Sequence, residues 1–265
     1  MIDSDSQFSI GLQRNTTARV LEGVDISAES AILEIGPLNR PVIRKDFSRI
    51  VHYIDHASTD ELRHKYKFED SVDVSSIVDI DIVAPDGRLL QHVPTRYDLI
   101  VAAHVVEHVP DLLGWIDEAL SALTDGGTLA LVVPDKRYTF DVNRRITPFN
   151  RAKDAWLENA KRPMLWNVID HYANVVKVGD PVDLFTKKLK PQDAEPVHTP
   201  EELHHAYLRH KAGEYIDCHS WVFTPDHFVE IIDQARMYLG LNFQISKMIP
   251  TPPGNLEFYV HLRRV

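Results

Sequence analysis

Short, continuous apolar runs recur through the first half of the chain and limit its fold more than any other feature. The clearest are AILEI at 31–35, YDLIVAA at 97–103 and TLALVVP at 128–134. Runs of this kind are typical of strands that are buried on both faces of a parallel sheet. RIVHYID, which ends at Asp55, and the weaker SIVDIDIV at 76–83 are further candidates. The sequence therefore predicts an α/β fold.

Helical patterns separate these strands. Residues 16–22 suit a short leading helix, and apolar residues between Leu112 and Leu123 recur at helical spacing behind Asp111, a favourable N-cap. The Asp-Gly-Gly string at 125–127 predicts a turn before the next strand. Strands separated by helices pair in parallel through right-handed crossovers, so we expect a parallel sheet.

The rhythm changes after Pro134. Residues 142–216 show scattered helical patterns without a clear strand, and ThrProGluGlu at 199–202 predicts a capped helix start. Another helix is expected to begin at ThrPro, 224–225. Two β-like runs at 242–249 and 255–264 then predict a hairpin that closes the chain.

Composition narrows the function classes. The formal net charge of −10 argues against a nucleic-acid partner. The single cysteine, Cys218, excludes an intrachain disulfide and a cysteine-based zinc cluster. The N-terminus lacks a basic start followed by an apolar core, and no apolar run approaches the roughly 18 residues of a membrane span. We therefore expect a soluble, cytoplasmic protein.

The order of elements resembles the class I S-adenosylmethionine-dependent methyltransferases, over about residues 15–135 and 222–265. The resemblance implies a Rossmann-like, mostly parallel seven-stranded sheet with a terminal antiparallel hairpin and a helical insertion. It implies a core of residues 1–141 and 222–265, with residues 142–221 covering the acceptor site. The expected reaction is methyl transfer from S-adenosylmethionine to a hydroxyl of a small molecule or glycan, and a homo-oligomer is left open.

Two sequence strings are similar to one particular group within this family. PDKRYTFD at 134–141 and YIDCHSWVFTP at 215–225 are similar to a group of bacterial methyltransferases associated with surface-polysaccharide biosynthesis. Asp141, Asp217 and His219 are candidates to hold sugar hydroxyls, and Tyr138 and Trp221 could stack on a sugar face. Each of these side chains could equally serve the fold alone.

The loop after the first strand is the first candidate for cofactor binding, because open parallel sheets bind ligands beyond the carboxyl ends of their strands. The family pattern there is an acidic residue, one further residue and then glycines, and Glu34 and Gly36 match its beginning. Gly36 would let the backbone approach the cofactor, while Glu34 would lie near its amino group or orient the loop. Pro37 stands where a later glycine is usual, which counts more against NAD than against S-adenosylmethionine.

Other strand ends supply the remaining cofactor candidates. Asp55, at the end of the second strand, is expected to accept hydrogen bonds from ribose hydroxyls. Asp81, or Asp79 one alternation away, would meet the adenine amino group. Ala103 and His104 end the fourth strand and would lie beside the reactive methyl group.

The string AAHVVEHVPD at 102–111 is the most specific motif. A near-neutral His104 could remove a proton from an acceptor hydroxyl, or it could merely pack against the cofactor. Glu107 and His108 would brace the loop or ligate a divalent ion, although our predicted site contains no metal. The same string fits the inverted zinc-peptidase motif His-x-x-Glu-His, but that motif requires a helix, which Pro110 restricts.

We predict His104, His219 and Asp141 as the catalytic residues, since a hydroxyl acceptor must lose a proton during methyl transfer. Two alternatives stay open at this point. A nicotinamide-dependent oxidoreductase would need more glycine in the first loop and a Tyr-x-x-x-Lys pair, which Tyr53, Tyr66 and Tyr97 do not provide. A non-catalytic binding protein with a methyltransferase fold would explain the single-glycine loop.

Overall fold

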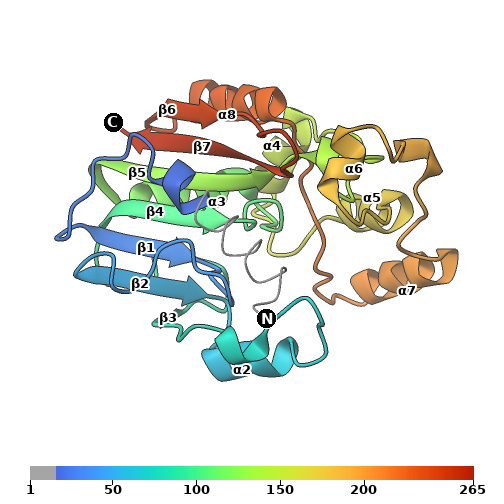
Figure 1. Ribbon diagram of the computed structural model, residues 1–265, viewed down its shortest axis with the longest axis horizontal. Helices are drawn as coiled ribbons and strands as arrows, with labels where there is room; N and C mark the ends of the chain where they lie inside the picture. Colours follow the sequence, from blue (N-terminus) through green and yellow to red (C-terminus); the bar gives the residue numbers. More distant parts are fainter. Residues whose placement is uncertain (1–15) are drawn as a thin grey trace, which may run out of the picture.

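Seven strands form one sheet in the order β3-β2-β1-β4-β5-β7-β6 in the computed structural model, which describes residues 16–265 (Figure 1). The strands are β1 Ala31–Ile35, β2 Ile50–Asp55, β3 Ile82–Val83, β4 Tyr97–Ala103, β5 Leu123–Pro134, β6 Phe243–Ile249 and β7 Glu257–Arg264. The first five pair in parallel, and β7 pairs antiparallel with both β5 and β6. The predicted fold class is confirmed.

Helices connect the strands, and the three that begin at Leu112, Pro200 and Pro225 begin where the sequence predicts. They are α2 Thr59–Lys65, α3 Leu112–Ser121, α4 Phe149–Leu157, α5 Leu165–Asn174, α6 Pro181–Phe185, α7 Pro200–Lys211 and α8 Pro225–Leu239. Asp111 caps α3 by accepting the Gly114 N–H at 2.9 Å. Thr199 and Glu202 form the expected capping box of α7. The predicted leading helix is present over residues 16–20, and the N-terminal segment before it lies outside the described residues.

The two faces of the sheet are covered differently. Leu33, Ile100 and Leu131 belong to a large buried cluster that also includes residues of α3, α4 and α8. On the opposite face, a smaller cluster joins Ile32 and Val101 to residues of the 16–20 helical turn and of the loop after β1. Alternate residues of the same strands therefore enter both clusters, as buried parallel strands require.

One local prediction is confirmed only in part, and another was wrong. The 76–83 run forms only the two-residue strand β3, because the Asp81 carboxylate accepts the Tyr53 N–H at 2.6 Å, where a longer β3 could offer a carbonyl. The Asp-Gly-Gly string at 125–127 lies within β5 instead of forming a turn before it. The register with β4 shifts from Tyr97–Leu123 to Leu99–Thr128, and Gly126 has a φ of 78°, so the string forms an irregularity inside the strand.

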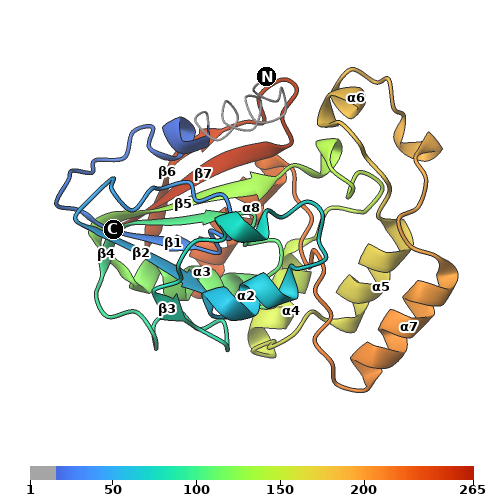
Figure 2. The ribbon, with the colours of Figure 1, turned by 60° about the horizontal axis from the view of Figure 1, so that its bottom comes forward.

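Helices α5, α6 and α7 form a lobe beside the sheet (Figures 1 and 2). A small buried cluster holds the lobe together: Val168, Ala206, Ile216 and Cys218. Helix α4 instead packs on the core, since Ala152 and Ala155 belong to the large cluster. The insertion boundary at 142–221 stays a prediction. No helix among the described residues is long and apolar enough to cross a membrane.

Candidate active site

The carboxyl ends of β1 and β4 meet at the switch point of the sheet, where the strand order reverses. Gly36 follows β1 with a φ of 65°, and its N–H donates to the Ile54 carbonyl at 2.9 Å. A Cβ at this position would lie 3.1 Å from Cγ2 of Val105 in the loop after β4. Glycine therefore allows the two loops to approach each other, and the buried Pro37 continues the turn.

Glu34 anchors the loop that leaves β1. Its carboxylate accepts the N–H groups of Val42 at 2.7 Å and Ile43 at 2.8 Å, and only 1% of the residue is exposed. Burial raises the pKa of Glu34 to about 7, although the two backbone donors act in the opposite direction. Glu34 was expected either to lie near the cofactor amino group or to orient the loop, and the structure shows that it orients the loop.

Asp55 and Asp81 differ in how far other residues already occupy their carboxylates. Oδ1 of Asp55 accepts the His56 N–H at 2.7 Å and lies 2.5 Å from Nδ1 of the same residue, whereas no described residue donates to Oδ2. Asp81 precedes β3, and its carboxylate already binds Lys45 and the Tyr53 N–H. Their roles in ribose and adenine binding stay predictions.

His104 lies directly beyond β4 in a left-handed conformation, with a φ of 54°. Its Nε2 lies 2.8 Å from Oε2 of Glu257 in β7, and its Nδ1 lies 3.4 Å from Oε1 of Glu107. Burial lowers the pKa of His104, but the two carboxylates outweigh this effect and raise it to about 10. The two carboxylates therefore favour the charged ring over the near-neutral histidine that the sequence predicts.

Residues 104–110 form no α-helix, and α3 begins only at Leu112. The inverted zinc-peptidase interpretation of His-x-x-Glu-His is therefore wrong, because it requires both histidines on one helical face. Glu107, His108 and His219 approach one another instead. One ligand atom from each of the three side chains lies within 4.8 Å of the others.

His219 and Asp141 form a buried pair at the edge of the lobe. Nδ1 of His219 lies 2.6 Å from Oδ2 of Asp141, and Oδ1 of Asp141 accepts a hydrogen bond from Arg144 at 2.8 Å. Burial raises the pKa of Asp141, but His219 and Arg144 outweigh this effect and lower it to about 2. A carboxylate therefore holds the imidazole in one orientation.

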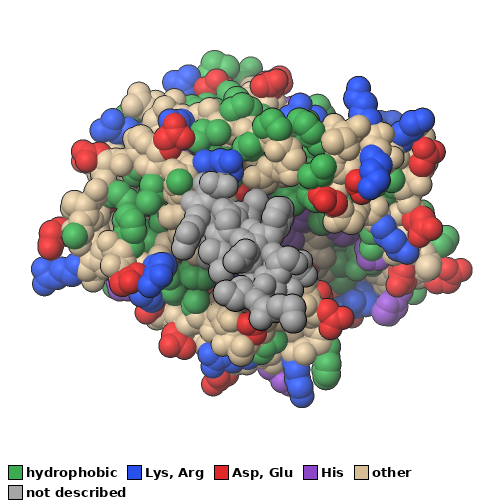
Figure 3. Space-filling view, in the orientation of Figure 1, with side chains coloured by type: hydrophobic (Ala, Val, Ile, Leu, Met, Phe, Trp, Pro, Cys, Tyr) green, Lys and Arg blue, Asp and Glu red, His purple; other side chains and the backbone are tan. Residues whose placement is uncertain are grey.

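Backbone contacts bring this pair to the strand ends. The Ser220 N–H donates to the Glu107 carbonyl at 2.7 Å, and the Trp221 indole donates to the Val109 carbonyl at 2.6 Å. Trp221 is only 1% exposed, so the prediction that it stacks on a sugar is wrong. Histidine side chains gather in the hollow between the sheet and the lobe (Figure 3).

Glu107 and Glu257 are the site residues that sequence reasoning missed or undervalued. Glu107 is completely buried and connects His104 to the His219 side of the hollow. Glu257 precedes the apolar run FYVHL of β7. A charged residue at the start of such a strand was the available signal, because a buried carboxylate requires a partner.

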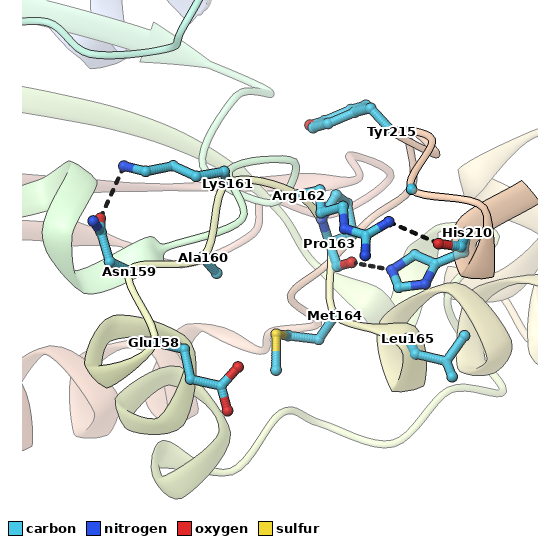
Figure 4. Close-up of a pocket in the computed structure, with 11 residues that line it drawn as sticks. Glu158, Asn159, Ala160, Lys161, Arg162, Pro163, Met164, Leu165, His210 and Tyr215 are labelled. Atoms are coloured by element: carbon cyan, nitrogen blue, oxygen red, sulfur yellow. Dashed lines mark hydrogen bonds between the residues drawn. The ribbon is translucent and has the colours of Figure 1, made fainter.

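A separate cavity of about 670 Å³ lies in the lobe (Figure 4). It is lined by residues 158–165 together with His210, Gly213 and Tyr215. The Pro163 carbonyl lies 2.8 Å from Nε2 of His210, and Arg162 donates to the His210 carbonyl at 2.7 Å. These contacts attach α7 to the loop before α5, and none of the predicted site residues lines the cavity.

A family profile described as a methyltransferase domain matches residues 7–234. The chain belongs to this methyltransferase family. It is an enzyme that uses S-adenosylmethionine as its methyl donor. No protein of curated function matches the sequence.

Solved structures with distant similarity include three methyltransferases. Magnesium protoporphyrin IX methyltransferase from Synechocystis PCC 6803, with bound SAH, shares 10% identity at a TM-score of 0.46, covering 100% of this chain and 89% of the other. A putative S-adenosylmethionine-dependent methyltransferase from Listeria monocytogenes shares 11% identity at 0.46, covering 95% and 99%. An S-adenosylmethionine-dependent methyltransferase from Mesorhizobium loti shares 13% identity at 0.46, covering 94% and 98%.

The strand ends fit this cofactor. Gly36 keeps the loop after β1 free of a side chain at the switch point of the sheet, and its left-handed φ suits glycine. Asp55 ends β2 with one carboxylate oxygen to which no described residue donates, as a ribose-binding residue requires. These features agree with a nucleoside bound across the ends of β1, β2 and β4.

Proposed function

We propose that this methyltransferase transfers the methyl group to a hydroxyl of a small molecule or glycan bound between the strand ends and the lobe. The observation that carries the proposal is the buried pair of His219 and Asp141, which Glu107 connects to His104 at the end of β4. A hydroxyl acceptor must lose its proton, and an oriented imidazole can accept one. The similarity of 134–141 and 215–225 to methyltransferases of surface-polysaccharide biosynthesis favours a glycan.

We assign direct cofactor contact to Gly36, Pro37, Asp55, Ala103 and His104, keep Asp81 as the adenine candidate, and assign Glu34 an indirect part through the loop that it holds. The sulfonium of S-adenosylmethionine supplies an activated methyl group, so the chain contributes mainly by positioning. Glu34 shapes the loop through the Val42 and Ile43 N–H groups. Asp55 would bind the ribose hydroxyls through its available oxygen.

The two predicted catalytic histidines take different roles in this proposal. His104 lies between Glu257 and Glu107, which hold it protonated, so it is unsuited to accept a proton. Nδ1 of His219 is bound to Asp141, which leaves Nε2 to face an acceptor hydroxyl. We therefore assign removal of the hydroxyl proton to His219, and we assign orientation of the loop after β4 to His104.

The test is transfer of radiolabelled methyl from S-adenosylmethionine to a panel of monosaccharides and oligosaccharides, each paired with its deoxy analogue. We expect label on a hydroxyl-bearing acceptor and none on the analogue that lacks that hydroxyl. His219→Gln should lower the rate by about 10²–10⁴-fold. His198→Gln, which replaces another histidine of the lobe, is the matched control, and labelling only of nitrogen or carbon acceptors would overturn the proposal.

A further inference from the structure

We propose that Glu107, His108 and His219 bind one divalent transition-metal ion. A ligand atom from each side chain lies within 4.8 Å of the other two. At ordinary metal–ligand distances of roughly 2.0–2.2 Å, two ligands on opposite sides of one ion lie about 4 Å apart. Small side-chain rotations therefore suffice to bring all three ligands to one ion.

The Glu107 carboxylate is the first reason to expect a cation here. The residue is completely buried, neither side-chain oxygen has a hydrogen bond from a described residue, and the ion-pair contact given for it is with Nδ1 of His104 at 3.4 Å. This single long contact, on one of the two oxygens, leaves the buried carboxylate without hydrogen bonds, and coordination of a metal ion would supply the missing partner. The Glu107 backbone is held in place, because its carbonyl accepts the N–H groups of Ser220 and Trp221.

The two histidines already have the outer partners that metal ligands require. Nδ1 of His108 lies 3.0 Å from Oδ1 of Asp217, and Nδ1 of His219 lies 2.6 Å from Oδ2 of Asp141. A metal-binding histidine usually donates its second ring N–H to a carboxylate, which fixes the tautomer and leaves the other nitrogen for the metal. Both rings thus present Nε2 as the metal-binding atom.

The donor set indicates the class of metal. Two imidazole nitrogens and one carboxylate oxygen suit zinc and similar first-row ions, whereas magnesium prefers oxygen ligands. Three protein ligands leave a coordination position for water or substrate. His104 is not a fourth ligand in this arrangement, since its Nε2 binds Glu257.

The role of the ion rests on the proposed function, whereas its binding does not. In the loaded protein, an acceptor hydroxyl would contact the ion through its oxygen and become more acidic. His219 would then serve as a ligand of the ion, and Asp141 would fix the orientation of its ring. With Nε2 on the ion, His219 could not take the proton itself, so the proton of the ion-bound hydroxyl would pass to water while His219 and Asp141 hold the ion in place.

The decisive experiment is calorimetric titration of the metal-stripped full chain with Zn²⁺ and with Co²⁺ alone, without cofactor or acceptor. We expect one ion per chain and visible absorption of the Co²⁺ form that is typical of mixed nitrogen and oxygen ligands. His108→Ala should weaken binding by at least about tenfold, in keeping with the loss of a ligand. Because the His108 side chain is partly exposed, we expect this variant to fold normally. An unchanged unfolding temperature would confirm that it does.

His198→Ala is the matched control, because His198 contacts His171 and stacks on Tyr172 in the same lobe without belonging to the triad. It should bind the ion like the wild type, whereas Glu107→Gln should resemble His108→Ala. The proposal is overturned if the wild type binds no stoichiometric ion. It is equally overturned if the triad variants bind as tightly as the control.

A methyl-transfer assay with and without a chelator separates this inference from the proposed function. Loss of transfer on metal removal, restored by Zn²⁺ or Co²⁺, supports the role of the ion. Full transfer to a hydroxyl without metal would overturn that role and leave the proposed function intact. Metal binding without any transfer to hydroxyls would count against the proposed function alone.

Discussion

The strand ends and the lobe contribute to the candidate site in different ways. At the strand ends, each residue is placed by the strand next to it in sequence: Gly36 follows β1, Asp55 ends β2 and His104 follows β4. At the lobe, His219 meets Asp141 across 78 positions of sequence, and both residues lie outside regular helices and strands. Periodicity can therefore locate the first half of the site, while the second half depends on tertiary packing.

The same contrast holds for stability. The strand ends rest on a buried cluster that extends across most of the sheet and into three helices, whereas the lobe has a cluster of four buried residues. Regions with few buried apolar contacts open at lower free energy than the core. We therefore expect the lobe to open independently of the sheet, which would let an acceptor enter.

The largest effect is expected from Leu33→Ala in β1. Leu33 is fully buried in the large cluster, and truncation should lower the free energy of unfolding by about 4 kcal/mol. Urea denaturation monitored by circular dichroism would measure the loss. A loss below about 1 kcal/mol would mean that the sheet is not the stable half of the molecule.

A somewhat smaller effect concerns pH and Glu34. Because its folded pKa of about 7 exceeds the ordinary value of 4.5, the folded state holds the proton more tightly and is favoured at low pH. The free energy of unfolding should fall by about 3 kcal/mol as the pH rises through this window. Urea denaturation at several pH values should show this fall in the wild type but not in Glu34→Gln, and parallel curves would contradict it.

Val168→Ala should cost less, at about 2 kcal/mol, because Val168 is buried in the four-residue cluster of the lobe. Hydrogen exchange should show faster exchange in α5 and α7, with β1 and β4 unchanged. Ala155, buried in α4, is the matched position on the core side, and Ala155→Gly should not accelerate exchange in α7. Faster exchange throughout the sheet would show that lobe and core unfold together.

Much of the fold was predictable because local chemistry and tertiary structure agree. The apolar runs became β1, β4 and β5, and the caps at Asp111 and Thr199 appear as expected. The strand expected over 76–83 is shorter than predicted, because the side chain of Asp81, and not a backbone carbonyl, accepts the Tyr53 N–H. The sequence pattern cannot distinguish an acidic residue inside a strand from one whose side chain replaces a strand hydrogen bond, since in both cases the acidic residue stands beside apolar ones.

The sequence predicted the position of a site residue only where the residue directly follows or ends a strand, so that the strand alone fixes its position. A histidine is expected to be near neutral, but the contact with Glu257 favours the protonated form of His104. Glu257 lies in β7, 153 positions away in sequence. Likewise, nothing in the string HVVEH predicts that Glu107 and His108 approach His219. Electrostatic environments of this kind arise from pairing between distant segments, which periodicity does not describe.

The measurement that tests the account most directly is calorimetric titration of the wild type and Asp55→Ala with S-adenosylhomocysteine, the demethylated product of the cofactor. Asp55 ends β2 and offers one oxygen to the ribose, so its loss should weaken binding by about 10–100-fold while leaving the unfolding temperature nearly unchanged. Zn²⁺ binding should be unaffected, because the proposed metal ligands lie elsewhere. Equal affinity in both proteins, or no heat from the wild type, would contradict a nucleoside site at the strand ends.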